Sequence, residues 1–138
     1  MTDYFEFSLD DDKINAISNL GLAHLGDAVY ELMVRGMLCA RVGGTSHGLH
    51  RKTIQYVSAH AQALAMERLK PILTEEEATV YKRGRNAHVK AVPSSATYGE
   101  YHSATGLEAL FGYLYLKGCK DRLNELFAIA MEEVDHAS

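Results

Sequence analysis

The chain has 138 residues, of which 47% are hydrophobic and 23% charged, and its formal net charge is −4. This composition is that of a globular protein and excludes a generally disordered chain. No uninterrupted apolar run approaches the roughly 18–20 residues that span a bilayer, so we expect no membrane segment. The acidic start, MTDYFEFSLDDDK, is unlike a secretory signal, and Cys39 and Cys119 stand far apart. We therefore expect reduced thiols and a cytoplasmic location.

The apolar residues recur at helical spacing along the chain, without an alternating strand pattern of any length. We therefore expect an all-α fold with a single domain over residues 1–138. A first short helix should start near Asp10–Asp12 and carry Ile14, Ile17 and Leu20. Ser18 or Asn19 should cap a second helix that runs to about Leu38.

Glycines, prolines and capping residues predict the later boundaries. After the break at Gly43-Gly44, Thr45 or Ser46 should cap a third helix that continues to Leu69, before Pro71. The remaining elements are expected in this order: a helix from the Thr74/Glu77 capping box to about Arg85, a polar connection over residues 86–100, an apolar helix over 101–117 ended by Gly118, and a last helix to about Val134. Polar connections of that length in compact domains are often functional.

Asp27 stands out in the second expected helix because an acidic residue follows a glycine within an apolar stretch. Between Ile14 and Val34 the only formally charged residues are Asp27 and Glu31. On a helical wheel Asp27 lies opposite the apolar stripe that would form the core. Gly26, which has no side chain, would leave space beside Asp27 for backbone, metal or RNA.

Glu108 is isolated in the same way, as the only formally charged residue between Glu100 and Lys117. An ionised carboxylate on a helix that is apolar nearly all round is costly unless it is paired, hydrogen-bonded or bound to a metal. Two carboxylates from different helices that face one cleft would suit Mg²⁺, and Mn²⁺ could replace it. Equally, Asp27 could accept a backbone N–H and Glu108 could pair with a buried arginine. Spacing alone does not decide between these interpretations.

The middle of the chain is basic although the whole is acidic. Residues 35–99 hold ten Lys or Arg against four Asp or Glu, and the two ends together hold four against fourteen. The densest part is YKRGRNAHVK, and the candidate RNA-contacting residues are Lys82, Arg83, Arg85, Asn86 and Lys90, with Arg51 and Lys52 as a second group. These cations could contact phosphates, which requires charge rather than base-reading groups. They could also form a solvated surface or stabilise a helix C-terminus.

Four segments, in order, resemble the Mini-III group of the ribonuclease III family. They are LGDAVYELMVR (25–35), YVSAHAQA (56–63), KRGRNA (82–87) and TGLEALFGYLYL (105–116). The resemblance implies a compact helical endonuclease domain that acts as a homodimer and cleaves double-stranded RNA with Mg²⁺. It places the family's metal-binding carboxylates at Asp27 and Glu108. It also implies precursor large-subunit (23S) ribosomal RNA as the substrate.

The sequence departs from the longer ribonuclease III pattern at two acidic positions, which are Ala23 and Thr105 here. We therefore expect Thr105 and Glu31 to act at most as outer groups that support the metal ligands. The absent acids also leave an alternative, a non-catalytic RNA-binding or ribosome-assembly module on the same scaffold. A third interpretation is a helical dimer that binds protein partners.

Overall fold

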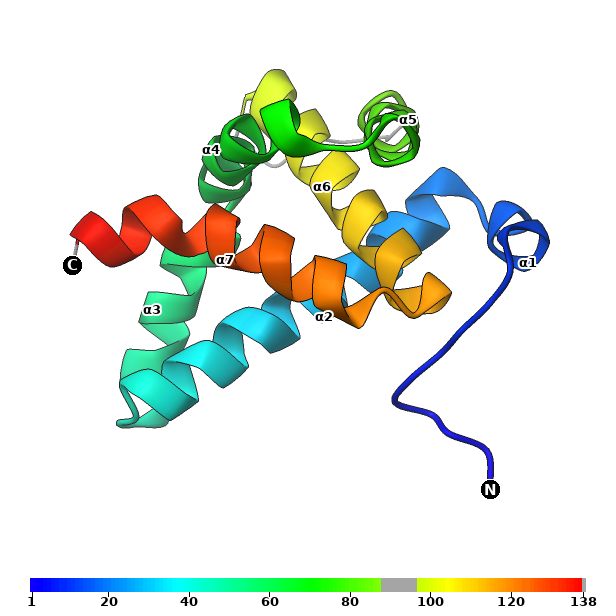
Figure 1. Ribbon diagram of the computed structural model, residues 1–138. Coiled ribbons are helices and arrows are strands. Elements are labelled where there is room, and N and C mark those ends of the chain that lie inside the picture. Colours follow the sequence, from blue (N-terminus) through cyan, green and yellow to red (C-terminus); the bar gives the residue numbers. More distant parts are fainter. Residues whose placement is uncertain (88–96, 138) are drawn as a thin grey trace.

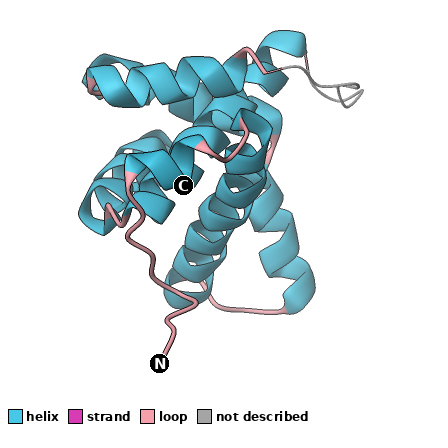
Figure 2. Ribbon diagram, turned by 90° about the vertical axis from the view of Figure 1, so that its right-hand side faces the viewer, coloured by secondary structure: helices cyan, strands magenta, loops and turns pink. Residues whose placement is uncertain are grey.

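The helix α6 (Tyr98–Lys117) lies at the centre of the molecule, in contact with α1, α2, α4, α5 and α7 (Figure 1). The computed structural model describes residues 1–87 and 97–137, with side chains as far as Glu132. Within these ranges every regular element is a helix, which confirms the all-α class (Figure 2). None of the helices described is both long enough and apolar enough to cross a membrane.

The helices follow closely from local sequence. In chain order they are α1 (Asp11–Asn15), α2 (Asn19–Arg41), α3 (Ser46–Val57), α4 (Ala59–Leu69), the short 3₁₀ helix η1 (Lys70–Ile72), α5 (Glu75–Arg85), α6 and α7 (Lys120–Ala137). The hydroxyls of Ser18 and Thr45 accept backbone N–H groups at the starts of α2 and α3, as predicted. The Thr74/Glu77 capping box starts α5, and Gly118 ends α6 in the left-handed conformation.

One predicted helix is in fact two. The sequence predicts a continuous helix from residue 46 to Leu69, but Ser58 adopts an extended conformation with ψ 154° between α3 and α4. Its hydroxyl accepts the N–H of Ala61 at 3.2 Å and so caps the start of α4. A serine side chain that bonds to nearby backbone in this way competes with the helical hydrogen bonds and favours a break. The break turns α4 toward α6, where Ala65, Met66 and Leu69 become buried.

Two further boundaries differ from the prediction. The first helix ends at Asn15, so it carries neither Ile17 nor Leu20. The helix α6 begins at Tyr98 rather than at residue 101, because Thr97 and Glu100 form a second capping box. The predicted polar connection over residues 86–100 is therefore shorter, and its residues 88–96 lie outside the described ranges.

The core forms where α2, α4 and α7 cover α6. Phe111 of α6 and Tyr30 of α2 are fully buried, and their rings meet edge to face with centroids 5.1 Å apart. Phe127 of α7 packs on the other side of Tyr30, with centroids 5.7 Å apart. Each such side chain contributes roughly 1.5–3 kcal/mol by burial, so these aromatic contacts fix how α2 lies on α6.

The backbones of α2 and α6 touch where both helices carry glycine. A Cβ atom at Gly26 would lie 1.5 Å from the carbonyl oxygen of Glu108, and one at Gly112 would lie 2.2 Å from the carbonyl oxygen of Leu22. Both distances are far below van der Waals contact, so neither position has room for any side chain. The sequence suggested that the space at Gly26 could admit backbone, metal or RNA, and the structure shows that backbone fills it.

We predict that Gly26→Ala lowers the free energy of unfolding by about 3 kcal/mol or more, because the added methyl group forces α2 away from α6. The matched control is Gly36→Ala on the same helix, where a Cβ meets nothing within 4 Å. Alanine there should stabilise the helix by about 0.5–1 kcal/mol. Urea denaturation followed by circular dichroism measures both. Equal stability of the two variants would contradict the close contact.

Candidate active site

Asp27 and Glu108 lie side by side where α2 crosses α6. Gly26 sits on the Glu108 carbonyl, so the next residue of α2, Asp27, directs its side chain toward that of Glu108. The Asp27 side chain is exposed to solvent, whereas Glu108 is largely buried. The two predicted metal ligands, 81 positions apart in the sequence, are therefore neighbours in the fold.

The electrostatics of the pair are unfavourable without a cation. Burial is the main cause that raises the pKa of Glu108 to about 8, and the charge of Asp27 beside it raises that pKa further. When protonated, Glu108 donates a hydrogen bond to Asp27, which adds to the same effect. At neutral pH Glu108 therefore stays protonated unless a positive charge lies beside it.

Buried polar groups lie around the Glu108 carboxylate. The side-chain amide of Gln62, on α4, approaches it and partly offsets the rise in its pKa. Tyr30 is fully buried near the same carboxylate. Burial raises the pKa of the Tyr30 hydroxyl, and the Glu108 charge raises it further. These two residues are absent from the site that the sequence predicted.

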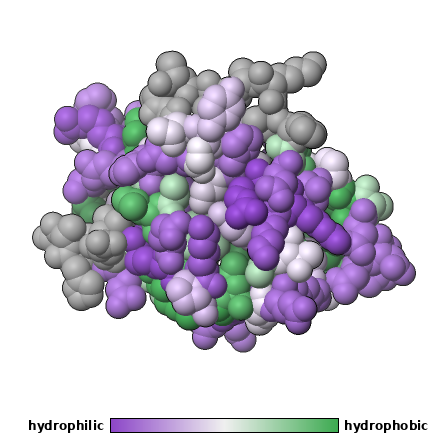
Figure 3. Space-filling view, turned by 90° about the horizontal axis from the view of Figure 1, so that it is seen from above, coloured by the Kyte–Doolittle hydropathy of each residue, from purple (hydrophilic) through white to green (hydrophobic). Residues whose placement is uncertain are grey.

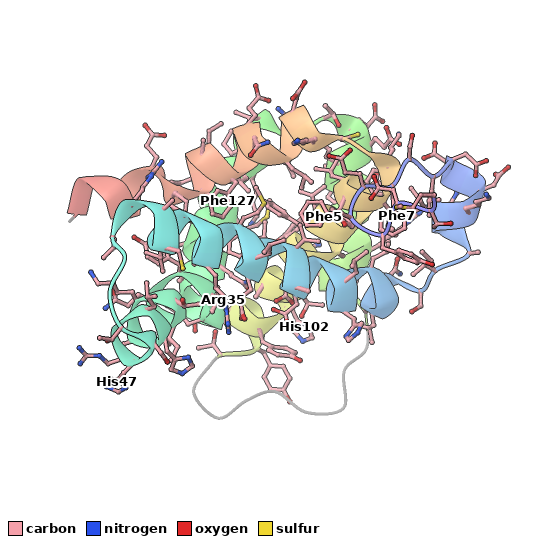
Figure 4. All side chains as sticks on the ribbon, turned by 90° about the horizontal axis from the view of Figure 1, so that it is seen from below. Phe5, Phe7, Arg35, His47, His102 and Phe127 are labelled. Atoms are coloured by element: carbon pink, nitrogen blue, oxygen red, sulfur yellow. The ribbon has the colours of Figure 1, made fainter. Side chains whose placement is uncertain are left out.

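The predicted supporting residues have their own partners. Glu31, one turn beyond Asp27 on α2, forms an ion pair with Arg35 at 2.7 Å. Thr105 is buried, and its hydroxyl donates to the carbonyl of Tyr101 at 2.9 Å. Figure 4 shows Arg35 from α2 and His102 from α6 on the same side of the molecule, while His47 lies apart from them at the start of α3.

The donor set fits a magnesium ion that keeps much of its water. Mg²⁺ prefers oxygen ligands and is commonly bound by one or two carboxylates plus water and substrate phosphates. Asp27 and Glu108 supply two carboxylates, and their coupling favours a cation between them. Within the part of the chain that the structure describes, no group of three or more His, Cys, Asp or Glu side chains could hold a metal. Tight binding by protein ligands alone is therefore not expected.

The basic end of α5 borders a groove beside the start of α2. The groove has a volume of about 620 Å³ and is lined by Ser18, Asn19, Leu20, Thr79, Lys82, Arg83, Asn86 and Ala87. It brings together three of the predicted RNA-contacting residues, Lys82, Arg83 and Asn86. Sequence reasoning missed the contribution of α2, because nothing local indicates that α2 starts against the end of α5.

The other predicted cations lie elsewhere. Arg85 is half-buried, with its guanidinium 5.6 Å from the centre of the Tyr81 ring. Arg51 and Lys52 are exposed on α3, which packs against α2. Lys90 falls outside the described residues. Seen from above, the molecule is mainly hydrophilic, with apolar side chains visible in smaller areas (Figure 3).

Comparison with known proteins agrees with this architecture. The family model of the ribonuclease III domain matches residues 20–118. A Mini-ribonuclease 3 of Symbiobacterium thermophilum is 47% identical over 84% of this chain and 89% of its own length. The Mini-ribonuclease 3 of Clostridium tetani is 37% identical over 100% of this chain and 93% of its own. A crystal structure of a protein from Fusobacterium nucleatum superposes with a TM-score of 0.80 at 32% identity, covering 88% of this chain and 97% of that one.

The chain therefore belongs to the ribonuclease III family and, within it, to the Mini-ribonuclease 3 proteins. This confirms the resemblance seen in the sequence and makes the protein an endoribonuclease. The matched region contains both Asp27 and Glu108.

The raised pKa of Glu108 predicts how stability depends on pH. Between its ordinary pKa of 4.5 and about 8, the folded protein binds more protons at this site than the unfolded chain. The free energy of unfolding therefore falls as pH rises through this range, by up to about 1.4 kcal/mol per pH unit, because the unfolded chain releases the Glu108 proton while the folded protein retains it. The neutral isostere Glu108→Gln removes this loss.

We expect Glu108→Gln to gain stability over the wild type steadily from pH 5 to pH 8, in urea denaturation without divalent cations. The control is Glu132→Gln at an exposed position of α7. A gap between Glu108→Gln and wild type that does not change with pH would refute the raised pKa of Glu108 in the folded protein.

Proposed function

We propose that this endoribonuclease cleaves double-stranded RNA with Mg²⁺ held by Asp27 and Glu108, and that precursor 23S ribosomal RNA is its natural substrate. The observation that carries the proposal is the contact of these two carboxylates at the crossing of α2 and α6. Mn²⁺, which accepts the same oxygen ligands, substitutes for Mg²⁺. The cytoplasmic location suggested by the cysteines stays a prediction.

Asp27 and Glu108 have different roles at the metal site, because their side chains differ in exposure to solvent. When bound, Mg²⁺ activates water and stabilises the charge that develops on the phosphodiester. Asp27, which is exposed, would hold the ion where solvent and the RNA backbone have access. Glu108, which is largely buried, would be the second ligand, and its burial limits the access of competing water to that carboxylate.

Affinity for the duplex comes from basic side chains of α5 and α3, two helices that both contact α2. The Lys82/Arg83 groove lies at the start of α2, and α3 with Arg51 and Lys52 packs against α2. A-form RNA offers its backbone and 2′-hydroxyls rather than its base edges, so separated cations suit it. This arrangement supports recognition of a duplex by shape.

We propose that the protein acts as a homodimer, because two-fold symmetry would present one carboxylate pair to each strand of the duplex. Exposed apolar side chains on three neighbouring helices support a contact between copies. They are Leu32 on α2, Ile54 on α3 and Leu64 on α4, each about half exposed.

Asp27→Asn should abolish cleavage of a long RNA duplex in Mg²⁺, with a loss of at least about a hundredfold, while the protein stays folded. The amide keeps the shape of the side chain and removes the negative charge that a hard cation requires. Product formation on denaturing gels measures the loss, and Asp12→Asn on α1, also exposed, is the control. Undiminished cleavage by Asp27→Asn would refute the proposed metal site.

Lys82→Ala combined with Arg83→Ala should weaken duplex binding several-fold and reduce the dependence of affinity on salt. Both side chains are exposed, so the free energy of unfolding should change by less than about 1 kcal/mol. Binding is measured without divalent cations at several salt concentrations. The control Lys120→Ala removes an exposed cation on α7 and should leave affinity nearly unchanged. An unaltered salt dependence in the double variant would exclude the groove from the interface.

A further inference from the structure

Gln62 places a buried side-chain amide beside the candidate active site. It is 2% exposed and lies in the first half of α4, the helix that the break at Ser58 turns toward α6. Its neighbours in the sequence, Ala61 and Ala63, are apolar. An amide at such a position is costly unless something pairs with it.

The Nε2 donor of Gln62 is buried within the described structure. Apart from the Glu108 carboxylate, which the amide approaches, it has no hydrogen-bond acceptor among the described residues. A buried donor left unpaired is costly, and an apolar side chain of the same size would avoid that cost. The group that it approaches is the Glu108 carboxylate, which also interacts with Asp27.

We propose that Gln62 is a positioning residue: its amide donates to the Glu108 carboxylate and holds one carboxylate oxygen toward the cation shared with Asp27. This inference rests on the metal site proposed above. Outer groups that hydrogen-bond to a metal ligand fix its orientation, and their removal typically weakens metal affinity 10–100-fold. Gln62 reaches Glu108 from the protein interior, so it can hold that ligand without touching the RNA.

The test is Mn²⁺ binding to the intact protein without RNA, measured by electron paramagnetic resonance. Gln62→Met keeps the volume and removes the donor, and it should raise the Kd for Mn²⁺ 10–100-fold. In duplex cleavage the same variant should need correspondingly more Mg²⁺ for half-maximal rate. Gln55→Met, at an exposed position of α3, is the matched control and should bind Mn²⁺ as wild type does. An unchanged Kd in Gln62→Met would overturn the inference.

Asp27→Asn separates this inference from the proposed function. If Asp27→Asn loses Mn²⁺ binding and Gln62→Met does not, only the role of Gln62 fails. If both variants bind Mn²⁺ as tightly as wild type, the metal site itself fails.

A measurement on the unaltered protein covers the case in which Gln62→Met does not fold. The chain has two glutamines, so selective ¹⁵N-glutamine labelling gives two side-chain amide signals. Addition of Mg²⁺ should shift the Gln62 signal and leave that of Gln55 in place. A Gln62 signal that does not respond to saturating Mg²⁺ would overturn the inference.

Discussion

The contact between the backbones of α2 and α6 is the constraint on which the other features depend. Gly26 and Gly112 let the two helices approach until each glycine meets a carbonyl oxygen of the other helix. The aromatic contacts of Tyr30 with Phe111 and Phe127 then hold α2 in place. Because Glu108 contributes that carbonyl and Asp27 follows the glycine, the same contact sets the carboxylates together. Core packing and site geometry thus have one origin.

The carboxylate pair works against the stability of the fold. A buried acid beside a second acid would be replaced readily if stability alone mattered, since an apolar or amide side chain fits the same space. The buried amide of Gln62 adds another unfavourable group nearby. Three unfavourable side chains that meet at one point from the three helices α2, α4 and α6 are typical of a site kept for chemistry.

Local features could be predicted from the sequence, and features set by helix placement could not. Ser18, Thr45 and the Thr74/Glu77 box define helix starts through contacts within three residues, so the sequence alone identifies them. Ser58 resisted prediction because the apolar spacing continues through it. Gln62 was missed for the same reason, since its burial depends on the direction in which α4 leaves that break. Asp27 and Glu108 could be singled out by their isolation, but their contact depends on how the two helices cross.

The basic groove lies at a fixed distance from Asp27, because α2 contributes residues to both. Ser18, Asn19 and Leu20 line the groove at the start of α2, and Asp27 of the carboxylate pair lies further along the same helix. Eight residues from Asn19 to Asp27 span about 12 Å at about 1.5 Å per residue. One helix thus contributes both to the groove proposed to contact phosphates and to the carboxylate pair proposed to bind the metal. In that proposal α2 sets the distance between the two contacts on the duplex, and one residue inserted in that span would turn them by about 100° relative to each other.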